Sequence, residues 1–284
     1  MSLISLLLAL SLERARRIGA RWWWQQVFHW WLQRFDLRSA AWQLLMTVFL
    51  PSALMLWLQM SLSGWLFGLA NLLLWILVPL FTLGCPPIQQ SYRDYLRAAA
   101  SGDEQACQLF NQQLLKQMHP LHQSDPEQSI ALSTGTQLMW LNYRYYFAVI
   151  LFYVLAGPAG ALFYACSRSL YLHKSTEVQA LSPTINQFMH YLDWLPSRIA
   201  SLCYLAVGHT AAALPIWLQS LRDRAHSNGY WLAKVAVASE LSEADLEHQA
   251  LCISTTSRFV SLAKRSIMFA ITIIALLTIA GWLI

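Results

Sequence analysis

Long apolar runs, separated by short polar stretches, dominate the pattern of this chain. An apolar run of about 20 residues is long enough to cross roughly 30 Å of hydrocarbon as a helix. Runs of about this length lie at residues 44–62, 65–83, 145–165 and 267–284. The pattern therefore predicts four membrane-spanning helices.

A fifth apolar run covers residues 199–218, but it contains His209 and Pro215. It crosses a bilayer only if these two residues are sheltered from lipid. A crossing here brings the basic residues of 219–266 back to the cytoplasm, which the positive-inside rule favours. We therefore expect an all-α, polytopic integral membrane protein with about four to five transmembrane helices and short interfacial or re-entrant helices.

The other segments are assigned from their length and charge. Residues 1–12 are too short to cross alone, so they are expected to form a short inserted or interfacial helix packed on the rest. Residues 13–43 combine arginines with tryptophans, which is typical of a cytoplasmic juxtamembrane segment. Residues 84–144 and 219–266 are predicted to be cytoplasmic loops. The whole chain, 1–284, is expected to form a single membrane domain.

The composition favours a lipid environment. Only 12% of the residues are charged and 57% are hydrophobic, whereas soluble domains carry about 25% charged residues. The net charge of +5 is concentrated beside apolar runs and forms no basic groove with interleaved aromatics. The expected partner is therefore the lipid bilayer and not nucleic acid. Five cysteines without C-x-x-C spacing do not predict a disulfide framework or a zinc site.

The most distinctive polar stretch stands at the start of the fifth apolar run, where Asp193, Trp194, Pro196 and Arg198 follow one another. Pro196 fits the first position of a helix, since no backbone N–H is needed there. Arg198 then lies at the positive end of the helix dipole, where a nearby anion should compensate its charge. Asp193 is one candidate, and a ligand phosphate or carboxylate is another. A membrane-entry motif, with Trp194 at the interface and Arg198 paired to Asp193, is the alternative.

Three further patterns are weaker. Residues 157–160, Gly-Pro-Ala-Gly, interrupt the third span, either beside a cavity or as a small-residue packing site; a transporter would need such a break. Glu243 and Glu247 share a helix face, but a solvated helix start explains them better than a metal site. His119 and His122 lack an acid or thiol at ligand spacing. No metal ligand and no nucleotide-binding or hydrolase motif is predicted.

Three parts of the chain are distinctive together: the Leu-rich start ending at Glu13-Arg14, residues 140–146 leading to 157–161, and residues 192–198 followed by Gly208-His209. They resemble the AmpE family of Gram-negative inner-membrane proteins, and the resemblance covers nearly the whole chain. The resemblance implies a multi-pass protein of the bacterial inner membrane. It also implies a regulatory or signalling modulator linked to β-lactamase induction, the response to antibiotics and peptidoglycan recycling, with an AmpD-type amidase or a cell-wall muropeptide as partner.

The AmpE family is in turn similar to the CobD/CbiB synthases, which attach a side chain in cobalamin assembly. This chain keeps the Asp-Trp-x-Pro-x-Arg element and an asparagine, Asn142. It replaces three carboxylates of the synthase motifs by Leu141, Tyr145 and Tyr171. Amide synthesis driven by ATP needs carboxylates to hold Mg²⁺ against phosphates. The losses argue against catalysis, so no catalytic residue and no cofactor are expected.

Two interpretations of function follow. The first is a non-catalytic protein that binds a ligand or a partner, with Glu13, Asn142, Asp193 and Arg198 as candidate ligand-binding residues. The alternative is a divergent amide synthase of the CbiB type that depends on ATP and magnesium. The resemblance to AmpE favours the first.

Overall fold

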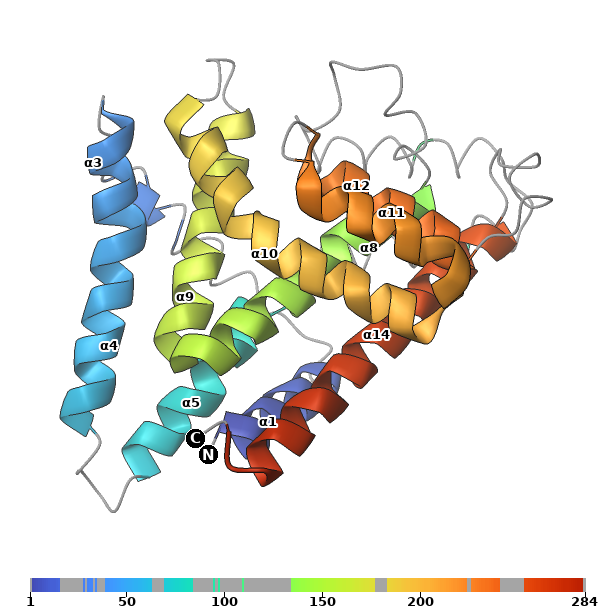
Figure 1. Ribbon diagram of the computed structural model, residues 1–284. Coiled ribbons are helices and arrows are strands. Elements are labelled where there is room, and N and C mark those ends of the chain that lie inside the picture. The colour runs from blue at the N-terminus through green and yellow to red at the C-terminus, as the bar shows by residue number, and fades with distance from the viewer. Residues whose placement is uncertain are drawn as a thin grey trace. The chain divides into compact units, whose positions relative to one another are not determined.

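Helices are the only regular secondary structure in the part of the chain that the computed structural model describes (Figure 1). That part comprises residues 2–15, 39–62, 69–83, 134–176, 183–223, 226–240 and 253–282, with a few single positions between 28 and 34 and at 94, 97 and 109. The prediction of an all-α membrane protein is confirmed. The two histidines of the first polar loop, the acids Glu243 and Glu247, and most of segments 13–43 and 84–144 lie outside the described residues.

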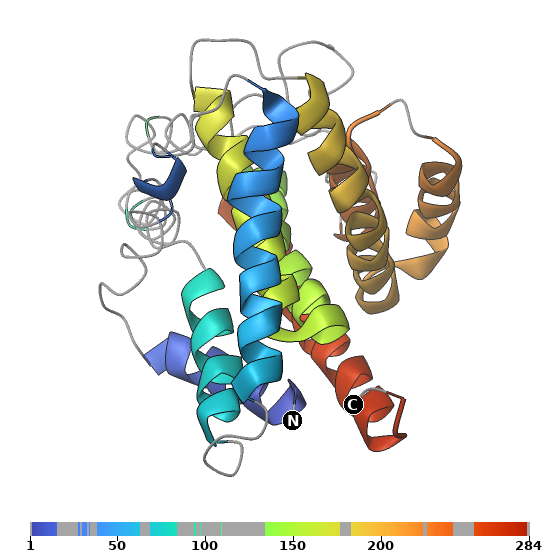
Figure 2. The same cartoon turned by 90° about the vertical axis from the view of Figure 1, so that its left-hand side faces the viewer.

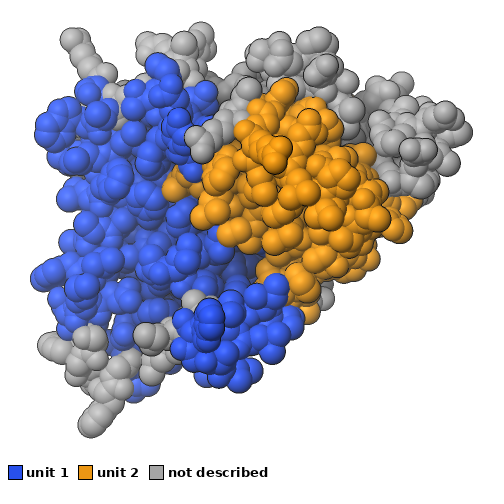
Figure 3. All heavy atoms as spheres, in the orientation of Figure 1, with its two compact units in different colours: residues 1–84, 145–191, 272–284 blue, residues 85–144, 192–271 orange. Residues whose placement is uncertain are grey.

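The chain divides into two compact units, coloured separately in Figure 3. Unit 1 comprises residues 1–84, 145–191 and 272–284, and unit 2 comprises residues 85–144 and 192–271. A single domain over the whole chain stays a prediction, and each unit is described by itself below.

Three helical stretches are long and apolar enough to cross a membrane: residues Ala41–Leu62, Gly135–His173 and Thr256–Ile279. They account for the predicted spans at 44–62, 145–165 and 267–284. The first stretch is formed by α3 (Ala40–Leu44), the π-helical segment η1 (Leu45–Phe49) and α4 (Leu50–Leu62). The second is formed by α8 (Thr134–Asn142), η4 (Tyr143–Phe147) and α9 (Ala148–Thr176), and the third by α14 (Ile253–Ile279).

Two apolar helices of unit 1 are shorter. Helix α5 (Leu69–Thr82) covers most of the predicted span 65–83, and α1 (Ser2–Ala15) contains the opening apolar run. Helix α1 packs on α5 and α9, as predicted for a short helix resting on the others, and α4 and α5 both pack on α9 (Figures 1 and 2). A count of four to five full crossings stays a prediction.

A proline inside α5 explains a polar bridge between three helices. Pro79 has no backbone N–H, so the Trp75 carbonyl one turn earlier has no helical partner. The Tyr153 hydroxyl of α9 donates a hydrogen bond to this carbonyl at 2.9 Å. Ser5 Oγ of α1 lies 2.6 Å from the same hydroxyl. Because the Tyr153 proton points to Trp75, the Ser5 hydroxyl is the donor in this second bond.

We expect Tyr153→Phe to lower the free energy of unfolding by about 1–2 kcal/mol, since it leaves a buried carbonyl unsatisfied. Pro79→Ala supplies the missing N–H, so the same substitution should cost much less in that background. Unfolding in mixed detergent micelles, followed by circular dichroism, measures both losses. Equal losses in the two backgrounds would show that Tyr153 does not act through the Trp75 carbonyl.

Helix α9 is broken where the Gly-Pro-Ala-Gly sequence predicted an interruption. Ala156 (φ −134°, ψ 19°) and Gly157 (φ 63°, ψ −152°) leave helical geometry, and Gly157 takes a conformation that favours glycine. A Cβ at Gly157 would lie 3.2 Å from the Trp75 ring of α5. The break therefore lies against packed protein, which supports the small-residue packing interpretation of this segment.

Unit 2 corrects the expectation about Pro196. Helix α10 (Pro183–Val207) begins at Pro183 and continues through Pro196, so this proline lies inside the helix and does not start it. Asp193 is likewise inside α10, and Arg198 is not in the first helical turn. The positive dipole end predicted beside Arg198 is therefore absent from this position.

The single spanning helix predicted for residues 199–218 is also wrong. Helix α10 ends at Val207, and α11 (Thr210–Arg222) begins after Gly208 and His209, which are not helical. Helix α11 packs on α12 (Asn228–Glu240), which also packs on α8. Leu205, Ala213 and Val235 form a buried cluster between α10, α11 and α12.

Candidate functional site

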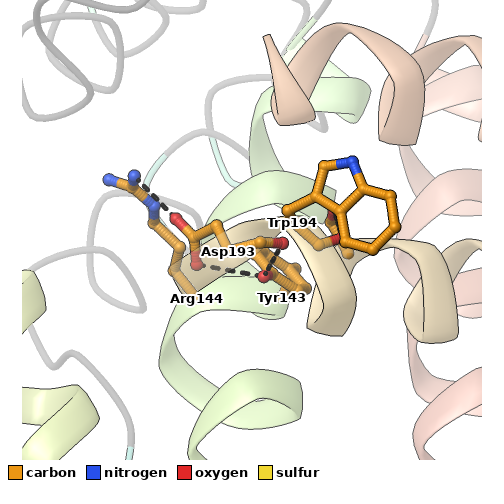
Figure 4. A network of polar contacts seen from close by, with 5 residues as sticks. Tyr143, Arg144, Asp193 and Trp194 are labelled. Atoms are coloured by element: carbon orange, nitrogen blue, oxygen red, sulfur yellow. Dashed lines mark hydrogen bonds and ion pairs between the residues drawn. The ribbon is translucent and has the colours of Figure 1, made fainter. Parts of the chain in front are cut away.

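The candidate site in unit 2 is a buried polar cluster around Asp193 (Figure 4). Arg144 Nη2 donates to Asp193 Oδ2 at 3.1 Å, which makes an ion pair. The Tyr143 hydroxyl donates to Asp193 Oδ1 at 3.0 Å and lies 3.2 Å from the Asp193 carbonyl oxygen. Asp193 is only 1% exposed and Arg144 only 4%. A carboxylate buried to this degree needs such partners, because desolvation penalises its charge.

The Arg144 guanidinium also packs against an aromatic ring, that of Trp140. Its Cζ atom lies 4.8 Å from the Trp140 ring centroid, in a cation–π contact. Trp140 stacks on Tyr143 with centroids 5.0 Å apart. Tyr143 and Arg144 stand at the start of the π-helical segment η4, and π-helical turns inside α-helices occur frequently at functional sites.

Arg198 is buried near this cluster, at 3% exposure, and its contacts differ from those of Arg144. Its Nε donates to the Ser220 carbonyl oxygen at 3.1 Å, and its Nη1 lies 3.4 Å from Ser197 Oγ. Ser220 belongs to the last turn of α11, where the helix dipole favours a cation. The Arg198 Nη2 atom is buried without a hydrogen-bond partner among the described residues.

The expected pairing of Asp193 with Arg198 is not what the structure contains, since Asp193 is held by Arg144. The reason is geometric. Two residues five positions apart in one helix are about 140° apart around its axis, so their side chains leave on different sides. Arg198 therefore reaches the end of α11, whereas Asp193 reaches η4.

Burial lowers the pKa of the Arg198 guanidinium from its usual 12.5 to about 10, and nearby Tyr143 and Asp223 oppose this shift. The group is therefore still charged at neutral pH. A buried cation with a free N–H group and a neutral carbonyl as its main acceptor is suited to an anionic partner.

Of the four ligand residues predicted from the sequence, three belong to unit 2 and one belongs to unit 1. Asp193 and Arg198 lie on consecutive turns of α10 in unit 2, and Asn142 is half-buried at the end of α8 in the same unit, directly before Tyr143. Glu13 belongs to α1 in unit 1. Asn142, Asp193 and Arg198 are thus the three candidates that one unit carries.

Sequence reasoning did not single out Tyr143, Arg144 or Ser220 as members of this cluster. Tyr143 and Arg144 belong to residues 140–146, one of the segments that carry the family resemblance. Polar side chains at the start of an apolar run could have marked these two residues as site candidates. Ser220 takes part through its backbone carbonyl, which no side-chain pattern reveals.

The three positions without the synthase carboxylates are buried. Leu141, Tyr145 and Tyr171 are each less than 8% exposed. The Tyr145 ring receives the Arg168 guanidinium at 3.9 Å from its centroid, within unit 1. The described part of the chain groups no three acids, histidines or cysteines that could hold a metal ion.

The long apolar helices and a buried, arginine-rich polar cluster define an all-helical membrane protein. A comparison with family models then identifies the family: residues 1–284 match the model described as "Regulatory signalling modulator protein AmpE". The chain belongs to the AmpE family, and the expected regulatory role is confirmed at the level of this family.

A curated relative supports the same assignment. "Protein AmpE" of Shigella flexneri is 30% identical over 290 residues, and the match covers 100% of both chains. No solved structure matches this chain. The wider similarity to CobD/CbiB synthases stays a prediction.

Proposed function

We propose that this protein is a non-catalytic signalling modulator of the bacterial inner membrane, multi-pass and linked to β-lactamase induction and peptidoglycan recycling. It acts by binding either an anionic ligand, such as a cell-wall muropeptide, or a protein partner, such as an AmpD-type amidase. The observation that carries the ligand-binding part is the buried Arg198 Nη2 group, which has no hydrogen-bond partner among the described residues.

The charges of the cluster favour an anion over a magnesium ion. Asp193 is the acid kept from the synthase motif, and Arg144 and Tyr143 already occupy its carboxylate. Magnesium needs open oxygen ligands, usually carboxylates, beside the phosphates of a nucleotide. Arg198 instead supplies a donor of the kind that recognises a carboxylate or a phosphate group.

Each candidate residue has a proposed part in binding. Arg198 contacts the anionic group of the ligand, and the half-buried amide of Asn142 offers a donor and an acceptor to its neutral part. Asp193 positions Arg144 and Tyr143 and does not contact the ligand through a free carboxylate. Glu13 remains a candidate for contact with a basic or amide group of the ligand.

The relation to the CobD/CbiB synthases is proposed as one of shared scaffold. It rests on Asp193, Trp194, Pro196 and Arg198 in the order of the synthase element, and on the retained Asn142. With Leu141, Tyr145 and Tyr171 in place of acids, the scaffold keeps a binding surface without the metal ligands of the reaction.

Equilibrium binding of a radiolabelled anhydromuropeptide to the purified full chain in detergent tests the proposal. We expect the unaltered chain to bind it and Arg198→Gln to bind at least about 10-fold more weakly, because a charge-assisted hydrogen bond contributes about 1.5–3 kcal/mol. The control is Arg222→Gln, an exposed arginine at the end of α11, which should bind as the unaltered chain does. Equal binding by all three chains, or no binding, would contradict the proposal.

A further inference from the structure

We propose that one exposed face of α14 binds an anionic phospholipid. The face is formed by Ser261, Lys264, Arg265, Met268 and Phe269, which all belong to unit 2. The phosphodiester group of the lipid contacts Lys264 and Arg265, and its acyl chains lie along Met268 and Phe269. This inference concerns a lipid site on the surface of the chain and does not depend on the buried ligand site proposed above.

One carboxylate, that of Glu240 at the end of α12, holds two arginines of α14. Arg265 Nη2 donates to Glu240 Oε2 at 3.0 Å, and Arg258 Nε lies 3.7 Å from Glu240 Oε1. Arg258 Nη2 also donates to the Glu240 carbonyl oxygen, at the negative end of the α12 dipole. Positions 258 and 265 are seven residues apart, so both side chains leave α14 on the same side. Glu240 therefore orients both guanidinium groups.

This cluster has more cations than anions. Lys264 is exposed and makes no ion pair with an acid among the described residues. With Arg258 and Arg265 it supplies three cations against the one carboxylate of Glu240, so the cluster carries a net charge of +2. The Arg265 side chain is 48% exposed and uses Nη2 for Glu240. Its other N–H groups and the Lys264 ammonium can therefore donate together to an anionic group outside the protein.

The exposed face of α14 changes from polar to apolar directly after these cations. Ser261, Lys264 and Arg265 are its exposed polar residues. Met268 and Phe269 follow them, at 68% and 37% exposure. Spacings of three and four residues place these side chains on one helix face. The sequence after Arg265 contains no Asp, Glu, Lys or Arg. A cationic surface followed by an apolar one matches a phospholipid, in which a charged head group is followed by acyl chains.

The direction of the side chains favours the same arrangement. Residues Thr256–Ile279 of α14 are long and apolar enough to cross a membrane. Side chains of an α-helix lean toward its N-terminus. Because the apolar part of α14 follows Arg265, the side chains of Lys264 and Arg265 lean away from the hydrocarbon and toward the head groups. Their alkyl stems stay beside acyl chains while their charged ends reach the level of the lipid phosphates.

The charge of the cluster selects the class of lipid. A zwitterionic head group carries an ammonium that offsets its own phosphate and is repelled by nearby cations. An anionic head group keeps the phosphate charge uncompensated, and each basic residue beside an anionic lipid surface strengthens binding by about 5-fold. An acidic protein segment would match Lys264 and Arg265 but would leave the neighbouring apolar residues without acyl chains. An anionic phospholipid matches both parts of the face.

Native mass spectrometry of the purified full chain, titrated with phosphatidylglycerol or phosphatidylcholine of identical acyl chains, tests the site. We expect the first phosphatidylglycerol to bind at least about 5-fold more tightly than the first phosphatidylcholine, and Lys264→Gln to weaken phosphatidylglycerol binding by about 5-fold. The control is Arg222→Gln, an exposed arginine at the end of α11, which should bind as the unaltered chain does. Equal losses in the two variants, or no preference between the lipids, would overturn the proposal.

Glu240→Gln separates a lipid site from an ion pair that only stabilises the fold. This variant releases Arg265 and raises the net charge of the cluster by one, so phosphatidylglycerol should bind about 5-fold more tightly although a salt bridge is lost. Unchanged or weaker binding by Glu240→Gln would show that the arginines it holds do not contact the lipid.

Two further measurements identify the occupant and its place. A phosphatidylglycerol with a photoreactive diazirine in one acyl chain should cross-link to the peptide that contains Met268 and Phe269, and soluble glycerol 3-phosphate should not displace it. Displacement would show a site for a free anion. Cross-linking confined to other peptides would show that the lipid binds elsewhere, and a dimer that Lys264→Gln dissociates would show a second copy on this face; each result would overturn the proposal.

Discussion

Asp193→Ala is expected to lower the free energy of unfolding by about 3–5 kcal/mol, the usual cost of leaving one member of a buried ion pair without its partner. Arg144 is nearly inaccessible to solvent and Asp193 carries the carboxylate with which it pairs. Tyr143 also loses its 3.0 Å carboxylate acceptor. Denaturant unfolding of the purified chain in detergent micelles measures the loss.

A double-mutant cycle separates the ion pair from the rest of the effect. Arg144→Met removes the cation and keeps an apolar side chain beside Trp140. If the ion pair carries the cost, Asp193→Ala with Arg144→Met should lose clearly less than the sum of the two single losses. A loss below about 1 kcal/mol for Asp193→Ala, or strict additivity, would mean that the pair is not what stabilises this cluster.

Gly208→Ala is expected to destabilise the chain by about 2–4 kcal/mol, through steric crowding and a lost backbone hydrogen bond. A Cβ at this position would lie 2.5 Å from the Ser239 carbonyl oxygen, which is the acceptor of the His209 N–H. Since the Ser239 carbonyl oxygen belongs to the backbone, it cannot move aside as the end of a flexible side chain would. The same unfolding experiment measures the change.

Gly229→Ala is the matched control for this substitution. Its Cβ would meet the Trp140 ring at 3.6 Å, an ordinary contact, and alanine is the better helix former at a position inside α12. We expect no loss of stability, or a small gain. Equal losses at Gly208 and Gly229 would show that the close approach of Gly208 to Ser239 is not the cause.

The helices of unit 1 follow from local features of the sequence. Length and hydropathy alone predicted the stretch that ends at Leu62 and the span within α9, because a bilayer requires every backbone group to be paired inside a helix. The break at Gly157 was also predicted, since Gly followed by Pro both permits a positive φ and removes an N–H donor. These features act over a few residues and need no tertiary partner.

The arrangement of unit 2 depends on contacts that local rules do not contain. Pro196 was predicted to start a helix, yet α10 continues through it because proline is tolerated inside a helix that tertiary packing supports. The run at 199–218 has the length and apolar character of a span, and its reversal is fixed by contacts to Ser220 and Ser239. A hydropathy pattern predicts which residues avoid water, but it does not show where the chain reverses its direction.

Two residues of the buried polar cluster were predicted, but the pairing between them was wrong. Asp193 and Arg198 were recognised as polar groups at the edge of an apolar run, and both are buried in unit 2. The partner of Asp193 is Arg144, which is 49 residues away in the chain. Such a pair is invisible without a structure or co-varying relatives, since only the fold brings η4 to α10.

The central claim is that this chain binds a ligand on a scaffold that has lost the metal ligands of a synthase. Turnover of magnesium–ATP by the purified full chain, measured as inorganic phosphate released in the presence and absence of the anhydromuropeptide, tests it most directly. We expect no release above that of the Asp193→Ala chain, although the unaltered chain binds the muropeptide. Phosphate release with formation of a ligated product, abolished by Asp193→Ala, would contradict the claim and establish a synthase.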